Sequence, residues 1–493
     1  MNLQFRNTLT REVETVRPLT DGRLGMYVCG PTVYAAPHLG HARSAVVFDI
    51  FRRFFEALGI HVVLVRNITD IDAKILRRAR ESSTDYRTIA DRYHRAYDAA
   101  LTALNVRPPH SAPRATDYIG PCRDIIACIL RRGHAYRRSG SVYFSSHSCR
   151  DYGRLSARSG GDVPAVETRP AFNPDKRHPD DFALWKKNRD GEPFWDSPWG
   201  PGRPGWHIEC TAMSHALLGV PFDIHGGGCD LIFPHHENEI AQSLGAFGTP
   251  PAVLWLHHGM VTVEEAKMAK SKGNAPPLED LLKTYPAEAV RLYLLSRHYR
   301  SDLPFSRAAL ENAVTRLSRL YALTRRLQGI LRGPLPAAPQ GSPLWQQFSR
   351  YMAADGNVPG GLAALFTTIR ELNRALDRPG SSSSAPVRQA VRISAADFSF
   401  ICRHILGVMR MSPDAYAQEL ACRPAHGGRL SPSEIHDLVA QRQAARQAAD
   451  WSTADRLRKR LEAYGVRLRD HGHATVWRHG KRKGRVASAE TLP

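Results

Sequence analysis

The sequence predicts an α/β fold in which a Rossmann-like, doubly wound parallel sheet with an insertion is followed by mainly α-helical C-terminal domains. Three observations support this prediction. The first 66 residues follow the order strand, helix, strand; a second alternation of helix and strand runs from about 205 to 258; and helical periodicity dominates beyond residue 285. Because 493 residues exceed the usual size of one domain, we expect several domains.

The first half of the sheet is expected near the N-terminus. Met26–Cys29 is a short apolar run that Gly30 and Pro31 interrupt, and His38–Gly59 then places apolar residues at helical spacing. The glycine at position 59 favours the end of that helix. His61–Arg66 is β-branched and apolar, so the order predicts a parallel strand pair joined by a right-handed crossover.

The second half of the sheet is expected after residue 205. Apolar residues at helical spacing alternate there with short extended runs. The predicted order is a helix at His207–Leu218, a strand at Pro221–His225, a helix at Pro234–Phe247 and a strand at Ala252–His257. We expect the two halves to share one sheet.

Composition divides the rest of the chain. Residues 116–204 carry many Gly, Pro and charged residues with weak periodicity, which is typical of an insertion. The stretches GPLPAAPQGSP and RPGSSSSAP read as linkers or long loops, and KRKGR predicts a basic tail, with a solvated, disordered end as the alternative. The predicted segments are the sheet halves 1–115 and 205–258, the insertion 116–204, a region 259–310 with a lysine-rich loop, a helical domain with linkers 311–430, a small domain 431–478 and the tail 479–493.

Charge and cysteine content limit the class of protein. Lys and Arg number 68 against 47 Asp and Glu, and the formal charge of +21 makes nucleic acid the leading class of partner. An Arg-rich composition that only favours solubility is the alternative. Eight scattered cysteines indicate reduced thiols or metal ligands rather than a disulfide framework. The sequence has neither a membrane span of roughly 18 apolar residues nor a signal-peptide pattern, so we expect a cytoplasmic protein with no membrane partner. We also expect a monomer.

Two short motifs indicate phosphate chemistry. The tetrapeptide HLGH, from His38 to His41, follows the first strand and opens the first helix, where backbone amides and the helix dipole favour a phosphate and Gly40 allows close approach. The stretch KMAKSKGN, from Lys267 to Asn274, is a basic loop suited to holding a triphosphate. Taken singly, the first motif is more often a pair of surface histidines, and the second could equally be an exposed turn.

Together, HLGH and KMAKS resemble the HIGH and KMSKS signatures of class I aminoacyl-tRNA synthetases, in the same order and on either side of an insertion. Within that class, the chain resembles the cysteinyl-tRNA synthetase family in the stretches FRNTLTRE, MYVCGPTVY, VRNITDIDAKI, RPGWHIEC, FDIHGGGCDLIFPHHENEIAQ and WLHHGMV. The resemblance covers roughly residues 1–325. Residues 431–478 resemble the anticodon-binding domain of that family, whereas residues 330–430 resemble the family only loosely, and 259–310 would contact the tRNA stem.

Four residues form a candidate metal site. His235 and Glu239 are four apart and therefore lie on one face of the predicted helix, and Cys29 and Cys210 would add two thiolates. Taken alone, the pair reads as an exposed helix face and the cysteines as small buried residues, because spacing does not show that the four converge. The resemblance implies that they do, as the ligands of one Zn²⁺ per chain. Zinc prefers a soft thiolate to a hydroxyl, so it would select cysteine over serine.

The resemblance implies that ATP, with Mg²⁺, activates L-cysteine to cysteinyl-adenylate and pyrophosphate, and that cysteine then passes to the 3′-terminal adenosine of its cognate tRNA. This chemistry needs positioned charges and no protein nucleophile. The candidate residues are His38, His41, Lys267 and Lys270 for catalysis; Gly40, Lys270 and Ser271 for ATP; Thr69, Trp206, His225 and Asp230 for the amino acid and adenylate; and Arg442, Asp450 and Trp477 for tRNA, with a base stacked on the tryptophan.

The chain departs from the family pattern at three positions. Ala269 replaces the first serine of the loop signature, Ala73 replaces an aspartate after ITDID, and Cys229 replaces the serine of HGGGSD. None of these changes removes a proposed ligand or a signature lysine. Loss of the loop hydroxyl would cost about 1 kcal/mol, the value of one hydrogen bond, and Cys229 is an alternative donor near the metal site.

Three other functions compete with this hypothesis. An ATP-dependent cysteine ligase of the mycothiol pathway would share the adenylation chemistry and the zinc, but the C-terminal domain and the basic charge favour tRNA. A zinc-stabilised RNA-binding protein would not need HLGH and the lysine loop together. A zinc peptidase is disfavoured because HHENE lacks the second histidine of the usual metalloprotease helix.

Overall fold

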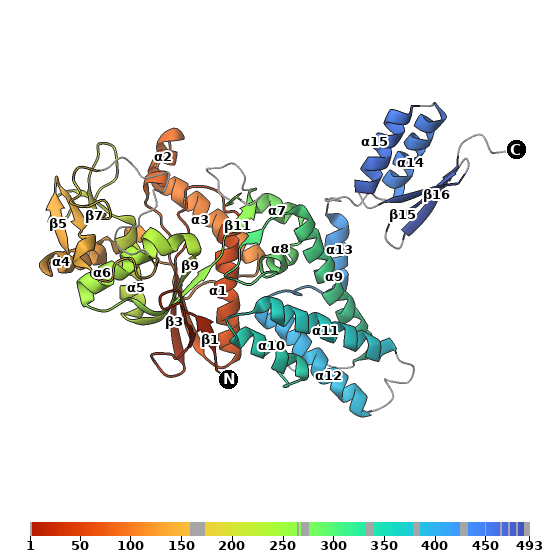
Figure 1. The fold of residues 1–493 in the computed structure, drawn as a ribbon, viewed down its shortest axis with the longest axis horizontal. Coiled ribbons are helices and arrows are strands. Elements are labelled where there is room, and N and C mark those ends of the chain that lie inside the picture. The colour runs from red at the N-terminus through yellow and green to blue at the C-terminus, as the bar shows by residue number, and fades with distance from the viewer. Residues whose placement is uncertain are drawn as a thin grey trace.

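The computed structural model shows a sheet domain with its insertion, a bundle of helices beside it and a small C-terminal unit that stands apart from both (Figure 1). The residues that it describes are 2–157, 173–263, 266–267, 276–331, 335, 339–377, 385–423, 432–448, 450–463, 466–471, 474–479 and 482–487. Among them, no helix is both long and apolar enough to cross a membrane.

The central sheet has four parallel strands, which come from both predicted halves. Its order is β10–β9–β3–β4, so Met26 of β3 lies opposite Leu64 on one side and Ile224 on the other. The strands are β3 (Arg23–Val28), β4 (His61–Arg66), β9 (Phe222–Gly228) and β10 (Ala252–His258). The α/β fold and the sharing of one sheet by the two halves are therefore confirmed.

Helix α1 (Leu39–Ala57) makes the crossover from β3 to β4. His38 is its N-cap, and Gly59 adopts φ +86° just beyond its end, a backbone conformation that glycine adopts without strain. Phe48, Phe51 and Phe54 of α1 are among its fully buried side chains, because helices cover α1 on the side away from the sheet. The sequence predicted both the position and the end of this helix.

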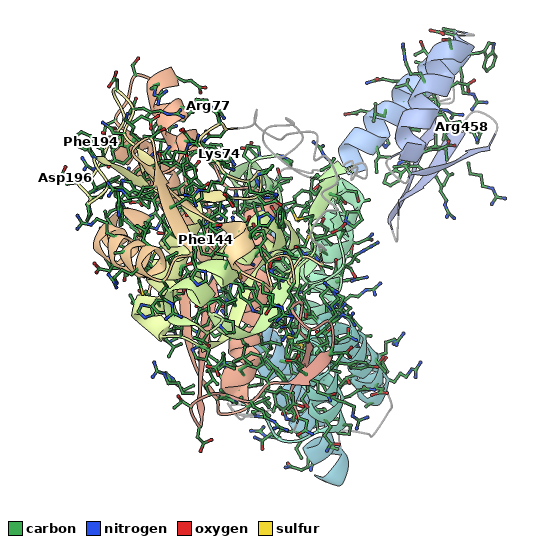
Figure 2. All side chains as sticks on the ribbon, turned by 60° about the vertical axis from the view of Figure 1, so that its left-hand side comes forward. Lys74, Arg77, Phe144, Phe194, Asp196 and Arg458 are labelled. Carbon is green, nitrogen blue, oxygen red and sulfur yellow. The ribbon has the colours of Figure 1, made fainter. Side chains whose placement is uncertain are left out.

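Two amphipathic helices, α2 (Ala73–Glu81) and α3 (Tyr86–Ala103), follow β4. Helix α2 contacts the insertion, since Arg80 Nη2 lies 2.6 Å from Glu192 Oε1. Figure 2 shows Lys74 and Arg77 of α2 near Phe194 of the insertion, with Arg458 on the distant C-terminal unit.

The insertion is a small unit with its own sheet. Helix α4 (Ile119–Arg131) packs on an antiparallel sheet of order β5–β6–β7–β8, where Phe144 stacks on Phe182 with ring centroids 5.0 Å apart. The strands are β5 (Ala135–Arg138), β6 (Ser141–Phe144), β7 (Phe182–Lys187) and β8 (Gly202–Pro204). Its core includes Ile208 and Ala241 of the second half, so the insertion is anchored to the sheet domain.

Short elements follow β10 and lie on either side of the lysine loop in the sequence. Strand β11 (Val261–Val263) pairs with β12 (Ala266–Lys267) on one side and with β13 (Leu303–Pro304) on the other. Helices α7 (Leu278–Thr284) and α8 (Ala287–Leu294) lie between them in the chain. Residues 268–275, which carry the rest of the loop, lie outside the described residues.

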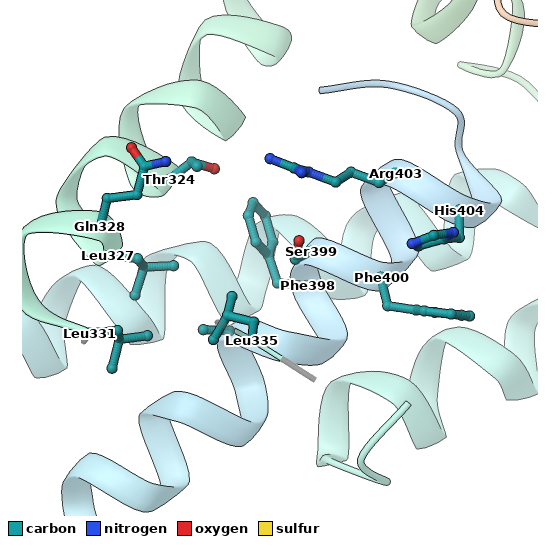
Figure 3. Close-up of a pocket in the computed structure, with 11 residues that line it drawn as sticks. Thr324, Leu327, Gln328, Leu331, Leu335, Phe398, Ser399, Phe400, Arg403 and His404 are labelled. Atoms are coloured by element: carbon teal, nitrogen blue, oxygen red, sulfur yellow. The ribbon is translucent and has the colours of Figure 1, made fainter. Parts of the chain in front are cut away.

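The predicted helical domain is confirmed as helical. Its helices are α9 (Arg307–Ile330), α10 (Pro343–Ala353), α11 (Val358–Asp377), α12 (Ala385–Phe400) and α13 (Pro413–Cys422). Leu327 of α9, the following Leu331 and Leu335, and aromatic residues of α12 line a cavity of about 360 Å³, together with Arg403 and His404 (Figure 3). The N-terminal strands β1 (Gln4–Arg6) and β2 (Val13–Thr15) touch this domain where Gln4 bridges Ala354.

The C-terminal unit corrects the predicted basic tail at 479–493. Helices α14 (Pro432–Gln447) and α15 (Trp451–Ala463) pack on a sheet of order β14–β15–β16. The strands are β14 (Arg467–His471), β15 (Ala474–His479) and β16 (Arg482–Ala487). The charged run therefore contributes a third strand, because the free edge of β15 offers backbone partners whatever the side chains are.

Candidate active site and metal centre

The candidate site lies at the carboxyl ends of β3 and β9. The chain leaves β3 on one side to form β4 and returns on the other side to form β9 and β10, so the connections diverge between β3 and β9. Ligands bind at such switch points in open parallel sheets. Cys29 follows β3 directly, and Gly228 ends β9, which places both at this crevice.

The four predicted metal ligands converge. Cys29, Cys210, His235 and Glu239 are all buried, and one donor atom from each lies within 4.8 Å of the others. Cys29 Sγ is 3.9 Å from Cys210 Sγ, 3.4 Å from His235 Nε2 and 3.7 Å from Glu239 Oε1. None of the eight cysteines forms a disulfide in the described part of the chain. Two sulfur donors, an imidazole and a carboxylate form the kind of donor set that zinc prefers.

Three elements besides β3 bring these donors together. Cys210 lies on α5 (Trp206–Leu218), and a kinked segment, η4 (Ile232–His236), in which Phe233 is extended, leads into α6 (Glu237–Phe247). His235 and Glu239 are therefore one turn apart, and His235 Nε2 lies 3.0 Å from Glu239 Oε1. The helical spacing predicted this pair, whereas only the fold shows that Cys29 and Cys210 join it.

Two further histidines support the donors. His225 Nε2 lies 2.9 Å from Glu239 Oε2, and His236 Nε2 lies 3.3 Å from Cys29 Sγ. These two histidines, with Cys29 and Glu239, form a second set whose donors lie within 4.8 Å of one another. His236 also contacts His257 Nε2, at 2.7 Å. The sequence analysis missed His236, although the adjacent histidines in PHHENE were the available signal.

Electrostatics favour anionic donors in the cluster. The hydrogen bond from Cys29 lowers the pKa of Cys210 to about 6, against the effect of burial. Burial would raise the pKa of Glu239, but His225 and His235 outweigh burial and lower it to about 2. Burial opposes the charged form of His235, yet Glu239 and Cys210 raise its pKa to about 10. A thiolate and a carboxylate are therefore available to a cation.

The first phosphate motif forms the start of α1. Gly40 N donates to His38 Nδ1 at 3.0 Å, His38 N donates to His41 Nδ1 at 3.2 Å, and the two rings stack with centroids 3.9 Å apart. A Cβ at Gly40 would lie 2.8 Å from the His38 ring, so a larger residue would disturb this cap. Of the second motif, Lys267 is described by its backbone in β12, whereas Lys270 and Ser271 lie outside the described residues.

The predicted pocket residues occupy different places. Trp206 stacks on His235 with centroids 4.2 Å apart, so it borders the metal cluster. His225 is fully buried behind Glu239. Thr69 is buried beside Asn67, whose Nδ2 donates to its hydroxyl at 3.2 Å. Asp230, in a short turn after β9, is exposed at the rim.

Two of the three predicted tRNA residues are buried. Arg442 forms a two-pronged ion pair with Asp470, with both N–O distances 2.9 Å, and is 4% exposed. Trp477 is also 4% exposed and belongs to the core of the C-terminal unit, so the expected stacking of a base on its ring is wrong for this conformation. Asp450 is exposed and accepts from Thr453 N at 3.0 Å. Its neighbour Trp451, which the sequence analysis missed, is 62% exposed.

Comparison with known proteins agrees with this architecture. A family model described as the tRNA synthetases class I (C) catalytic domain matches residues 15–315, and one described as the cysteinyl-tRNA ligase anticodon binding domain matches 430–478. Among solved structures, a Mycobacterium tuberculosis methionyl-tRNA synthetase in complex with methionyl-adenylate aligns with a TM-score of 0.58 and 16% identity. The alignment covers 82% of this chain and 94% of that one. Fold and family model together define a class I aminoacyl-tRNA synthetase.

Close relatives specify the family within this class. The cysteine–tRNA ligase of Thioalkalivibrio sulfidiphilus is 45% identical over 97% of this chain and 100% of that protein. That of Halorhodospira halophila is 45% identical over 97% of this chain and 99% of that protein. The chain belongs to the cysteine–tRNA ligase family.

Proposed function

We propose that this chain activates L-cysteine with ATP and transfers cysteine to the 3′-terminal adenosine of its cognate tRNA. The observation that carries the proposal is the convergence of Cys29, Cys210, His235 and Glu239 at the switch point of a sheet that also presents the HLGH helix start. Such a site brings a sulfur-selective centre and a phosphate-binding centre to one crevice. Selective activation of cysteine requires both.

We propose Cys29, Cys210, His235 and Glu239 as ligands of one Zn²⁺ per chain. The overlapping set with His225 and His236 lacks the second sulfur, which makes it the less suitable choice for a metal that must favour a thiol. When bound, zinc supplies an affinity for the thiolate of substrate cysteine that the hydroxyl of serine does not match. Cys229 remains outside the proposed ligands, because it is in neither buried set.

The surrounding residues would orient this donor set. His225 holds one oxygen of Glu239 and leaves the other toward the sulfurs. The indole of Trp206 covers the ring of His235 and would border the side chain of the amino acid. Thr69 and Asp230 would contact the polar atoms of cysteine and of the adenylate, one from the buried side and one from the rim.

The two signatures would act on the triphosphate. His38, Gly40 and His41 lie at the helix start and would hold the phosphates there. Lys267 and Lys270 would neutralise the charge of the pyrophosphate and Ser271 would donate a hydrogen bond to it, with Mg²⁺ accompanying ATP. The cysteine carboxylate attacks the α-phosphorus, the bond to the β-phosphate oxygen breaks, and pyrophosphate leaves with its electron pair. No protein nucleophile takes part.

The C-terminal unit would read the anticodon. Trp451 and Asp450 lie together at the exposed start of α15, so an unpaired base could stack on the indole and bond to the carboxylate. Arg442 would support anticodon binding indirectly, because its ion pair with Asp470 holds β14 in place. It would contact RNA directly only by giving up this ion pair. We propose that the protein acts as a monomer in the cytoplasm.

Aminoacylation of total tRNA with labelled cysteine tests the proposal. We expect charging with cysteine but not with serine, and loss of charging after a zinc chelator. Cys210→Ser should lose bound zinc and charging, whereas Cys402→Ser, at a buried cysteine far from the cluster, should retain both. Persistence of cysteine-dependent pyrophosphate exchange without any charging would instead support the mycothiol-type ligase, which the anticodon-binding match does not favour. Absence of both activities would refute the proposal.

A further inference from the structure

Arg43 is a buried cation that lies two residues beyond HLGH on α1. Its side chain is fully buried, and its guanidinium donates to four backbone carbonyl oxygens. Arg43 Nη1 lies 2.8 Å from Met260 O, and Nη2 contacts Ser301 O, Tyr299 O at 3.1 Å and His298 O at 3.3 Å. One side chain therefore links the start of α1 to two segments that are more than 200 residues away in the sequence.

These carbonyls border the strand that leads to the lysine loop. Met260 directly precedes β11, and Thr262 of β11 pairs with Lys267 of β12. Residues 298–301 lead into β13, which pairs with β11 on its other side, where Leu303 N donates to Met260 O at 2.8 Å. Arg43 thus holds both the entry to β11 and the turn before its neighbour β13.

The bonding of Arg43 is unusual for a buried charge. Within the described ranges, the hydrogen-bond partners of its guanidinium are backbone carbonyls, and Asp302 acts on it through charge alone. Burial lowers the pKa of Arg43 to about 10. Simple packing would be served better by an apolar side chain, because an apolar group has no desolvation penalty. The guanidinium of Arg43 instead donates hydrogen bonds to carbonyl oxygens of two segments and so holds the segments together.

We propose that Arg43 is a positioning residue that sets the HLGH helix start relative to the β11–β12 strands and so aligns the two signatures on ATP. It acts through backbone atoms and does not touch the substrate. This inference rests on the proposed function, because it assigns Arg43 a role in ATP activation. It predicts that loss of the guanidinium fork disturbs the use of ATP and spares recognition of cysteine at the metal cluster, which other elements build.

Arg291 provides a matched control. It is equally buried and also donates to backbone carbonyls, those of Leu406, Leu104 and Asn105, but it pairs with Asp49 at the junction between α1 and the helical domain. Among the described residues, the hydrogen bonds and ion pair of Arg291 involve only Asp49, Leu104, Asn105 and Leu406, and not the segments around β11. A general effect of removing a buried guanidinium should therefore change ATP kinetics in variants of both residues. A positioning effect should change them only in variants of Arg43.

The test compares Arg43→Lys and Arg43→Met with Arg291→Lys in cysteine-dependent pyrophosphate exchange. For both Arg43 variants we expect kcat/KM for ATP to fall about 10- to 100-fold, with the smaller loss for lysine, while KM for cysteine and bound zinc stay unchanged. Arg291→Lys should lower the melting temperature without this selective loss. Equal losses for ATP and cysteine, or ATP kinetics like those of Arg291→Lys, would overturn the inference.

A second variant covers the case in which an Arg43 variant does not fold. Asp302 is exposed and its Oδ1 accepts from Met260 N at 2.7 Å, so Asp302→Ala should loosen the same turn with little loss of stability. We expect a smaller fall in kcat/KM for ATP, again without a change in KM for cysteine. Unchanged ATP kinetics in a folded Asp302→Ala would count against the inference. If the wild-type protein shows no cysteine-dependent exchange, it is the proposed function that fails.

Discussion

Two tryptophans of the C-terminal unit occupy opposite environments. The ring of Trp477 packs among Ile435, Val439 and Leu461, and that of Trp451 is 62% exposed. Residue type alone predicts an amphipathic aromatic residue in both cases. Burial decides the role: the first ring stabilises the unit, and the second is available to a partner.

Substitution of these tryptophans should separate stability from RNA binding. Trp477→Ala should destabilise the C-terminal unit by about 3–5 kcal/mol, because it empties a buried aromatic site. Trp451→Ala should change stability by less than about 0.5 kcal/mol and weaken tRNA binding by about 1–3 kcal/mol, the value of one stacked base. Urea unfolding and KM for tRNA measure the two effects, and Trp451→Phe should restore part of the binding. The assignment fails if Trp477→Ala leaves the unit as stable as before.

Asp49 of α1 makes stability depend on pH. Burial alone would raise the pKa of this carboxyl, but Arg291 and Arg53 outweigh burial and hold the pKa below its ordinary value of 3.8. A carboxyl with a lowered folded-state pKa stabilises the fold above its ordinary pKa, and this contribution is lost as pH falls through the folded-state pKa.

We therefore expect Asp49→Asn to destabilise the protein by about 3–5 kcal/mol at pH 7, because it leaves buried arginines without their anion. The difference in melting temperature from the wild-type protein should narrow below about pH 4. Asp414→Asn is the control, since that carboxylate is 86% exposed in its pair with Arg325 and should change little at any pH. A difference that stays constant with pH would contradict this account.

At the scale of elements, β16 completes the C-terminal sheet. It pairs with β15 over six positions, from Ala474 opposite Ala487 to His479 opposite Arg482. A chain that ends at His479 should lose hydrogen-exchange protection in β15 and charge tRNA more slowly, while pyrophosphate exchange is retained. A chain that ends at Ala487 is the control and should behave as the full chain does. Unchanged protection of β15 in the shorter chain would show that β16 does not stabilise the sheet.

The elements that the sequence predicted well are those with strong periodicity. Helix α1 and strands β3, β4, β9 and β10 were predicted because long apolar patterns reflect burial on several sides. The insertion's strands were not, since they are short and carry exposed charges such as Arg137 and Arg138. Strand β16 was missed for a similar reason, because its charge concealed a backbone pairing that depends on an open sheet edge.

Sequence patterns also could not predict how residues far apart in the chain converge at the metal cluster. The spacing of His235 and Glu239 predicted their shared helical face, whereas Cys29 and Cys210 are separated by 181 residues and their approach depends on the sheet order. That these cysteines approach His235 and Glu239 was predicted only by the resemblance to a family. The buried state of Arg442 and Trp477 was not predicted, because neither residue belongs to a pattern that distinguishes a core from a binding surface.

At the scale of the whole molecule, a charge of +21 should make tRNA charging sensitive to salt and cysteine activation much less so. Each phosphate contact contributes roughly 0.7–0.9 to the slope of log affinity against log salt concentration. We expect KM for tRNA to rise steeply between about 50 and 200 mM salt, with pyrophosphate exchange nearly constant. Steady-state kinetics over this range measure both. Parallel losses in the two assays would point to a salt-sensitive fold and not to RNA binding.

The order of strands in the central sheet also has a consequence for synthesis on the ribosome. Strand β3 pairs with β9, yet about 190 residues, including the whole insertion, are translated between them. At about 5–20 residues per second, one edge of an apolar strand stays without its partner for roughly 10–40 s. The nascent chain is therefore most exposed to misassociation during this interval, and protection by a chaperone would matter most before residue 228 emerges.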